Sequence, residues 1–160
     1  MVPGVGGSSP LGRPSFGRPG AAGSGPVEHD AVLFANEAFY RAFATRDLAA
    51  MDEVWARHVP VACIHPGWAP LQGRAEVMRS WQRILANPES PAIACQDAHA
   101  TIFGDSALVV CFEAVADGYL VASNLFVRQG AVWKLVHHQA GPTTGQPEDE
   151  PAEEGSGRPN

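Results

Sequence analysis

The chain has 160 residues, with 17 acidic and 11 basic side chains and a formal charge of −6. This length suits a single domain built around one hydrophobic core. The acidic balance, with no basic stripe, argues against nucleic acid as a partner, and no apolar run is long enough for a membrane span or the core of a signal peptide.

The two ends of the chain differ in composition from its middle. Residues 1–26 are mostly Gly, Pro, Ser and Ala, and residues 143–160 are rich in Pro and acidic side chains. Segments with so few large apolar side chains cannot offset the entropy lost on ordering, so both ends are predicted to be disordered. The folded domain is therefore expected at residues 27–142.

Apolar periodicity predicts three helices. Apolar residues recur at three- and four-residue steps over residues 29–45, which indicates a helix with one buried face. Asp47 is placed to cap a short second helix, which Pro60 ends. A third helix is expected over residues 74–87, because the same spacing recurs there and Pro88 follows.

Strands dominate the remainder of the chain. β-rich runs are expected at residues 61–65, 92–103, 107–116, 119–128 and 131–140. Turn pairs separate them, of which Asp117-Gly118 is a strong hairpin signal. Helices followed by an antiparallel meander define the α+β class, and such a sheet is expected to curl around the helices and leave a concave pocket.

The cysteines indicate a reducing compartment. Cys63, Cys95 and Cys111 are odd in number and lie inside apolar, strand-like runs. This favours buried, reduced thiols over a disulfide framework, and we expect a cytoplasmic protein.

Four stretches together resemble a known superfamily. They are "NEAFYRAFATRDLAAMDEVWA", "CIHPGW", "LQGRAEVMRSWQRIL" and "ASNLFVRQGAVWKLVHHQAGP". In order and placement the chain resembles the nuclear transport factor 2-like (NTF2-like) superfamily, in particular its SnoaL-like, ketosteroid-isomerase-like branch. The resemblance implies a cone-shaped, curved antiparallel sheet wrapped around three N-terminal helices, with a small-molecule pocket and a homodimer.

The same resemblance implies little about activity, because the superfamily includes isomerases, cyclases, dehydratases and non-catalytic modules. Its steroid isomerases use a catalytic Asp with a Tyr–Asp oxyanion hole. This chain does not match that set, since Tyr40 falls on the first helix and Tyr119 beside a turn.

The hairpin around Asp117-Gly118 predicts which side chains share a face of the sheet. A two-residue turn there pairs Cys111 with Asn124, and Glu113 with Ala122. Glu113 and Asn124 then lie on the polar-and-apolar face that suits a pocket wall. Burial would raise the pKa of Glu113 toward that of a useful general base, and Asn124 could orient a substrate carbonyl. The alternatives are an exposed carboxylate and an amide bonded to backbone.

The pair His137-His138 presents a choice, because neighbours on a strand point to opposite faces. A two-residue Gln129-Gly130 turn would direct His137 into the pocket. A bulge at Gly130 would direct His138 there instead, and we favour His138 as the catalytic histidine. The other histidine would be structural or at an interface, so His137 is retained as an alternative substrate-binding residue.

His65, Trp68 and Trp81 complete the predicted site. His65 ends the first strand, where it could act as a base or an orienting group, or could simply precede the Pro66-Gly67 turn. The two tryptophans are expected to form apolar walls, although Trp81 also suits the plain helix core. No ligand pair has metal-binding spacing, so no metal is expected.

These residues predict a protein that binds a small, mostly apolar molecule. If it is an enzyme, we expect cofactor-independent proton transfer, such as isomerisation or the addition or removal of water. The alternative is a non-catalytic dimerisation or ligand-sensing module of the same fold.

Overall fold

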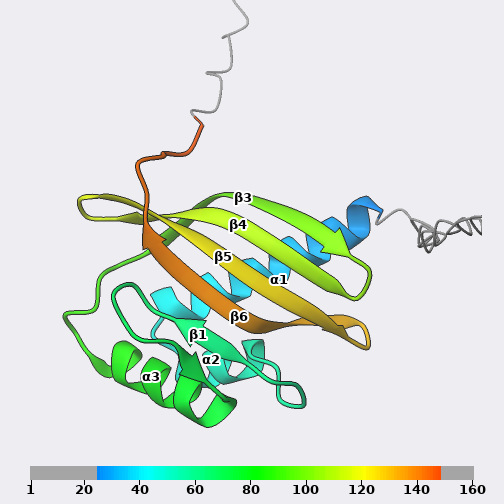
Figure 1. Cartoon of the computed structure of the whole chain (residues 1–160), viewed down its shortest axis with the longest axis horizontal. Helices are drawn as coiled ribbons and strands as arrows, with labels where there is room; N and C mark the ends of the chain where they lie inside the picture. Colours follow the sequence, from blue (N-terminus) through cyan, green and yellow to red (C-terminus); the bar gives the residue numbers. More distant parts are fainter. Residues whose placement is uncertain (1–24, 149–160) are drawn as a thin grey trace, which may run out of the picture.

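The structure, a computed structural model, describes residues 25–148 (Figure 1). Residues 1–24 and 149–160 lie outside the described residues, so their predicted disorder stays a prediction. Within the described part the order is α1 (Pro26–Ala44), α2 (Leu48–Val54), β1 (Ala62–Ile64), β2 (Leu71–Gln72), α3 (Arg74–Ala86), β3 (Ala94–Phe103), β4 (Ser106–Val115), β5 (Gly118–Gln129) and β6 (Val132–Pro142). This confirms the predicted α+β class.

Local sequence explains where the helices begin and end. The Asp47 carboxylate accepts a hydrogen bond from the Ala50 amide at 2.9 Å and so caps α2, as predicted. α2 ends at Val54, so Pro60 is not what stops it. α3 ends before Asn87, whose extended backbone is the conformation favoured immediately before a proline.

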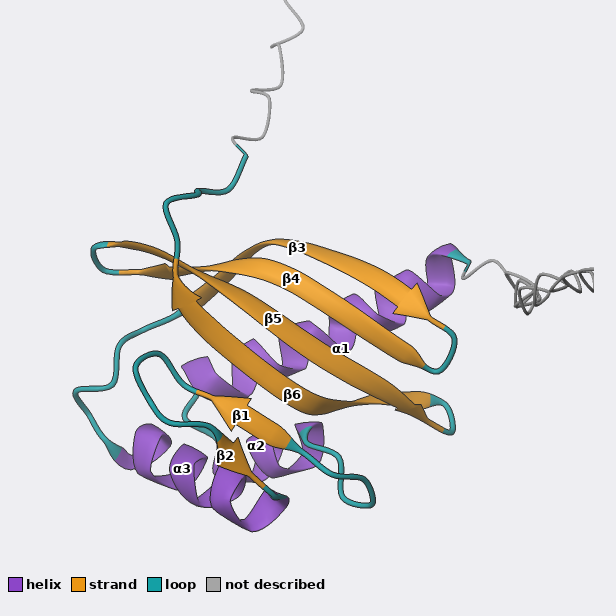
Figure 2. Cartoon of the chain, viewed as in Figure 1, coloured by secondary structure: helices purple, strands orange, loops and turns teal. Residues whose placement is uncertain are grey.

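The strands form one sheet in the order β2-β1-β6-β5-β4-β3. The expectation of an antiparallel sheet holds for the meander β3 to β6 but is wrong for β1, which runs parallel to β6. The short strand β2, which was not predicted, pairs antiparallel with β1. In Figure 2, α1 crosses one face of the meander, while α2 and α3 lie beside β1 and β2.

The buried face of α1 is not wholly apolar. Val32, Phe39 and Phe43 are buried on it, as the apolar stripe predicts. Asn36 and Tyr40, one turn apart on the same face, are also buried. Two polar side chains therefore enter the space between α1 and the sheet.

The turn between β4 and β5 lies one residue earlier than predicted. Gly118 pairs with Val115 and has a φ of 142°, a conformation that favours glycine, so it begins β5 instead of sitting inside the turn. Asn124 therefore pairs with Val109 and Glu113 with Leu120, so the predicted pairings of Asn124 with Cys111 and of Glu113 with Ala122 are wrong. The register differs by an even number of residues, so each side chain keeps its predicted face.

A bulge inside β6 decides which histidine faces the helices. Phe126 pairs with Leu135, whereas Asn124 pairs with His138, so Val136 is an extra residue in the strand. The irregularity was expected in the preceding turn. Its place within the strand allows side chains on both sides of the bulge to be buried.

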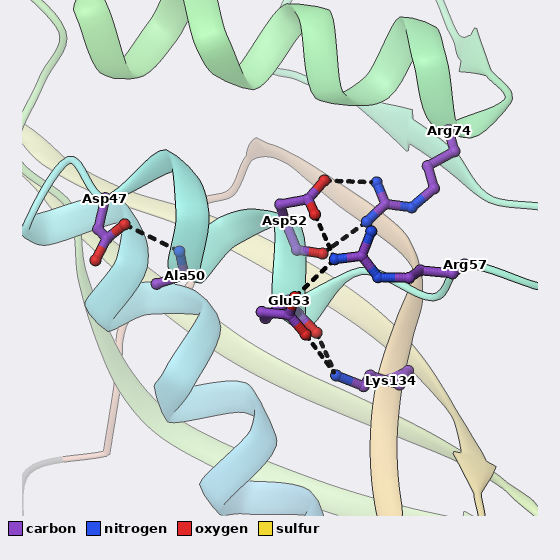
Figure 3. A network of polar contacts seen from close by, with 7 residues as sticks. All are labelled: Asp47, Ala50, Asp52, Glu53, Arg57, Arg74 and Lys134. Carbon is purple, nitrogen blue, oxygen red and sulfur yellow. Dashed lines mark hydrogen bonds and ion pairs between the residues drawn. The ribbon is translucent and has the colours of Figure 1, made fainter.

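A polar network attaches α2 to its neighbours (Figure 3). Asp52 accepts hydrogen bonds from Arg57 at 2.5 Å and from Arg74, the first residue of α3, at 2.9 Å. Lys134 on β6 donates to the backbone oxygen of Glu53. The network links α2 to both α3 and the sheet.

Among residues 25–148, no helix has the length and apolar character needed to cross a membrane.

Candidate functional site

A cavity of about 540 Å³ lies between α1, α3 and the inner face of the sheet. Much of its wall is aromatic or aliphatic, formed by residues that include Phe39, Phe43, Trp68, Trp81, Ile84 and Leu120. Three titratable side chains reach it from separate strands or strand ends, namely His65, Glu113 and His138. An apolar cavity of this size with a few converging polar groups is typical of a small-molecule site.

Glu113 lies on β4 and is only 2% exposed. The Tyr40 hydroxyl donates a hydrogen bond to its Oε1 at 2.9 Å. Burial raises the pKa of Glu113, and the bond from Tyr40 offsets part of that rise. The protonated carboxyl therefore persists to a higher pH than that of an exposed glutamate.

Tyr40 has a defined role as donor and acceptor. Its single hydroxyl proton is directed at Glu113, so its oxygen accepts from other neighbours. Asn124 Nδ2 lies 3.2 Å from that oxygen, and Cys111 Sγ also lies 3.2 Å from it. Burial raises the pKa of Tyr40, which keeps the hydroxyl protonated.

His138 is held by Asn124. The distance from His138 Nδ1 to Asn124 Oδ1 is 2.6 Å, and an amide oxygen can only accept, so Nδ1 carries the proton. Burial lowers the pKa of His138 to about 3, with smaller contributions from His65 and His137, and the ring is neutral. Nε2 is then an unprotonated acceptor, 3.9 Å from Glu113 Oε1.

His65 is held in a similar way by α3. The Ser80 hydroxyl donates to the Val77 carbonyl at 2.7 Å, so it accepts from His65 Nε2 at 2.8 Å. Burial lowers the pKa of His65 to about 4. Trp81 and Trp68 both pack edge-on against the His65 ring, with centroid distances of 4.7 Å and 5.0 Å.

The structure brings most of the predicted site residues to one place. His65, Trp68, Trp81, Glu113 and His138 line the cavity. Two predicted residues do not.

Asn124 is fully buried behind the wall, where it holds His138 instead of facing a ligand. His137 pairs with Leu125 on the opposite face of the sheet, so its proposed place in the pocket is wrong. The bulge at Val136 is the physical reason.

Sequence reasoning missed Asn36, Tyr40 and Ser80. All three are polar residues at helical spacing within apolar faces, and that pattern could have marked them. A buried polar side chain on such a face needs a partner, which here is supplied by the sheet or by His65. In residues 25–148 no group of three or more His, Cys, Asp or Glu side chains is arranged to hold a metal ion.

Comparison with known proteins agrees with this architecture. The family model of the SnoaL-like domain matches residues 32–144. The chain therefore belongs to the SnoaL-like domain family of the NTF2-like superfamily, which confirms the resemblance in its sequence. No curated protein matches the chain significantly.

Solved structures give three points of reference. An NTF2-like protein from Streptomyces avermitilis, provisionally described as a dehydratase, is 35% identical, with a TM-score of 0.67 over 74% of this chain and 98% of that one. A protein from Thiobacillus denitrificans, provisionally described as a calcium/calmodulin-dependent protein kinase type II association domain, is 34% identical, with a TM-score of 0.58 over 68% and 92%. An NTF2-like protein of unknown function from Pseudomonas putida shares the fold at 16% identity, with a TM-score of 0.64 over 73% and 87%.

Proposed function

We propose that this protein is a cofactor-independent enzyme that removes water from, or adds water to, a small and mostly apolar substrate. The observation that carries the proposal is the gap of 3.9 Å between Glu113 Oε1 and His138 Nε2. That gap is too long for a direct hydrogen bond, but an oxygen atom in the cavity, to one side of the line that joins the two atoms, would reach both. A substrate hydroxyl or a water molecule fits this position.

The two groups can divide a dehydration between them. Protonated Glu113 gives its proton to the leaving hydroxyl, while His138 Nε2 takes a proton from the neighbouring carbon. The C–O and C–H bonds break, and a C=C bond and a water molecule form. The proton then passes from His138 to Glu113 through that water before the water leaves the cavity.

Coupling between the two groups makes His138 a competent base. Its pKa is low chiefly because burial disfavours the imidazolium, with smaller contributions from His65 and His137. Loss of the proton from Glu113 leaves a carboxylate within 3.9 Å, and an opposite charge at that distance raises the pKa of His138. Each proton transfer therefore favours the other. The same pair could also shift a double bond, which would make the enzyme an isomerase.

The relative from Streptomyces avermitilis supports the choice of water elimination, since it is 35% identical over nearly its whole length. The substrate class that suits this chemistry is a β-hydroxy ketone with an aromatic or aliphatic body. The carbonyl acidifies the carbon-bound proton, and the apolar wall accepts the body.

A panel of aryl β-hydroxy ketones tests the proposal. The rise in ultraviolet absorbance of the unsaturated ketone measures turnover, and exchange of the α-hydrogen in heavy water detects proton abstraction. We expect Glu113→Gln to lower kcat by roughly 10²–10⁴-fold with little change in KM. Glu76→Gln, an exposed glutamate on α3, serves as the control. Turnover that survives Glu113→Gln would contradict the assignment.

A non-catalytic association module is the second candidate. It is supported by the 34% identity to the association-domain protein of Thiobacillus denitrificans. It is also supported by the outer face of the sheet, which carries Val110, Phe112 and Leu125 and would suit a second copy of the chain. A protein with no turnover or exchange on the panel, but with self-association through this face, would favour the module.

A further inference from the structure

The hydrogen bonds behind His138 continue beyond Asn124 to the first helix. Asn124 Nδ2 donates to Asn36 Oδ1 at 2.8 Å. Asn36 Nδ2 in turn donates to Cys95 Sγ at 3.5 Å, which directs the amide oxygen of Asn36 toward Asn124. Asn36 and Asn124 are 1% and 0% exposed, so water does not compete for these bonds.

In this series of hydrogen bonds, the neighbouring groups determine which atom donates and which accepts. The Tyr40 hydroxyl uses its proton in the hydrogen bond that it donates to Glu113, so it can only accept from Asn124. Asn36 likewise presents an oxygen to Asn124. Both contacts require the NH₂ group of Asn124 on the helix side, and its oxygen is then left to face His138.

We propose that Asn36 is a positioning residue that sets the tautomer of His138 through Asn124. With Asn36 in place, Asn124 offers only an acceptor to His138 Nδ1, so the ring proton stays on Nδ1 and the lone pair of Nε2 faces Glu113 and the cavity. A rotated Asn124 amide would present NH₂ to Nδ1 and move the ring proton to Nε2. This inference rests on the proposed function, since the Nε2 lone pair is the base in that reaction.

Nitrogen-15 NMR of histidine-labelled protein tests the proposal without any substrate. The two ring nitrogens of a neutral histidine differ widely in chemical shift according to which one carries the proton. The His138 signals are identified by their loss in His138→Gln, among the six histidines of the chain. We expect the wild type at pH 7 to show a protonated Nδ1 and an unprotonated Nε2.

Two variants of similar size separate positioning from packing. Asn36→Leu removes the acceptor for Asn124, and we expect the ratio of the Nδ1–H to the Nε2–H tautomer to fall by about tenfold. Asn36→Asp keeps an acceptor oxygen there and is expected to retain the wild-type tautomer. A protonated Nε2 in the wild type overturns the proposal, as does an unchanged tautomer in folded Asn36→Leu. If both variants fail to fold, a protonated Nε2 in the wild type would still overturn the proposal.

Kinetics add a second readout. If the panel of hydroxy ketones yields a substrate, Asn36→Leu should lower kcat by about tenfold at unchanged KM, and Asn36→Asp should restore it. A loss confined to KM would overturn the positioning role. If no compound is turned over but the tautomers behave as expected, the proposed function fails while the role of Asn36 stands.

Discussion

Among the polar residues of the site, Tyr40 is the one whose loss we expect to destabilise the protein most. It is buried, donates to Glu113 at 2.9 Å and accepts from Asn124 at 3.2 Å. Tyr40→Phe leaves both partners short of a bond, and we expect the free energy of unfolding to fall by about 1–3 kcal/mol. The measurement is urea denaturation, with Tyr119→Phe beside the β4–β5 turn as the control. Equal stability of the two variants would show that Glu113 and Asn124 find other partners.

The two neutral histidines predict how stability depends on pH. Burial lowers the pKa values of His65 and His138 from 6.5 to about 4 and about 3. The unfolded chain binds these protons first, so the stability that the histidines contribute is present above pH 6.5 and is lost as the pH falls toward 4. Glu113, whose pKa is raised, acts in the opposite direction over the acidic range.

A single variant isolates the histidine effect. Between pH 7 and pH 5, His138→Gln should lose about 1–2 kcal/mol less unfolding free energy than the wild type. The comparison is made by urea denaturation at both pH values, with the exposed His58→Gln as the control. If the wild type and His138→Gln lose the same amount, His138 is not buried as a neutral ring.

At the scale of single residues, the sequence predicted part of the site. Glu113 was identifiable because a carboxylate inside a β-rich run needs a partner. Its partner Tyr40 was not, because the packing of α1 on the sheet decides which polar residue of the helix reaches which strand. A contact of this kind joins residues far apart in the chain, 73 positions for Tyr40 and Glu113, and periodicity carries no information about it.

At the scale of the elements, one arginine holds the segment after α3 in place through hydrogen bonds. Arg46, in the loop between α1 and α2, donates to the carbonyls of Leu85, Asn87, Pro88 and Ser90. Asn87 and Ser90 line the cavity. Arg46 therefore secures a wall of the site from outside.

Arg46→Lys tests this attachment. Lysine keeps the charge, but one ammonium group cannot reproduce the fork of donors that meets these carbonyls. We expect a loss of about 1–2 kcal/mol in unfolding free energy and faster amide hydrogen exchange in residues 87–93. Arg79→Lys, an exposed arginine on α3, is the control. Unchanged exchange in residues 87–93 would mean that the segment holds itself in place.

The elements were the most predictable level of the structure. The helices and the four long strands follow from periodicity and from turn and cap residues. The parallel pairing of β1 with β6 and the bulge at Val136 did not follow, because both depend on how distant strands meet. The faces of β4 and β5 were nevertheless right, since a register error of an even number of residues preserves them.

For the whole molecule, we propose the outer face of the sheet as the surface that would contact a second copy. Val110 on β4 is 39% exposed there, beside other half-buried apolar residues of β4 and β5. If a homodimer forms through this face, Val110→Glu should convert it to a monomer, because a charge would be buried without a partner. Light scattering after size-exclusion chromatography measures the mass.

The matched control for that change is Phe34→Glu. Phe34 is 66% exposed on α1 and does not belong to the sheet. It should leave the mass of the assembly unchanged. A dimer that persists in Val110→Glu, or that dissociates equally in Phe34→Glu, would assign self-association to another surface.

The bond between Asn36 and Asn124 joins residues 88 positions apart, from the first helix to the fifth strand, and His138 is added by the last strand. During synthesis, the helices and Glu113 therefore leave the ribosome well before His138, the proposed base, is available to join them. Contacts of such long range form only once the chain has closed on itself. The proposed site is therefore complete only once β6 has joined the sheet, because that strand supplies His138.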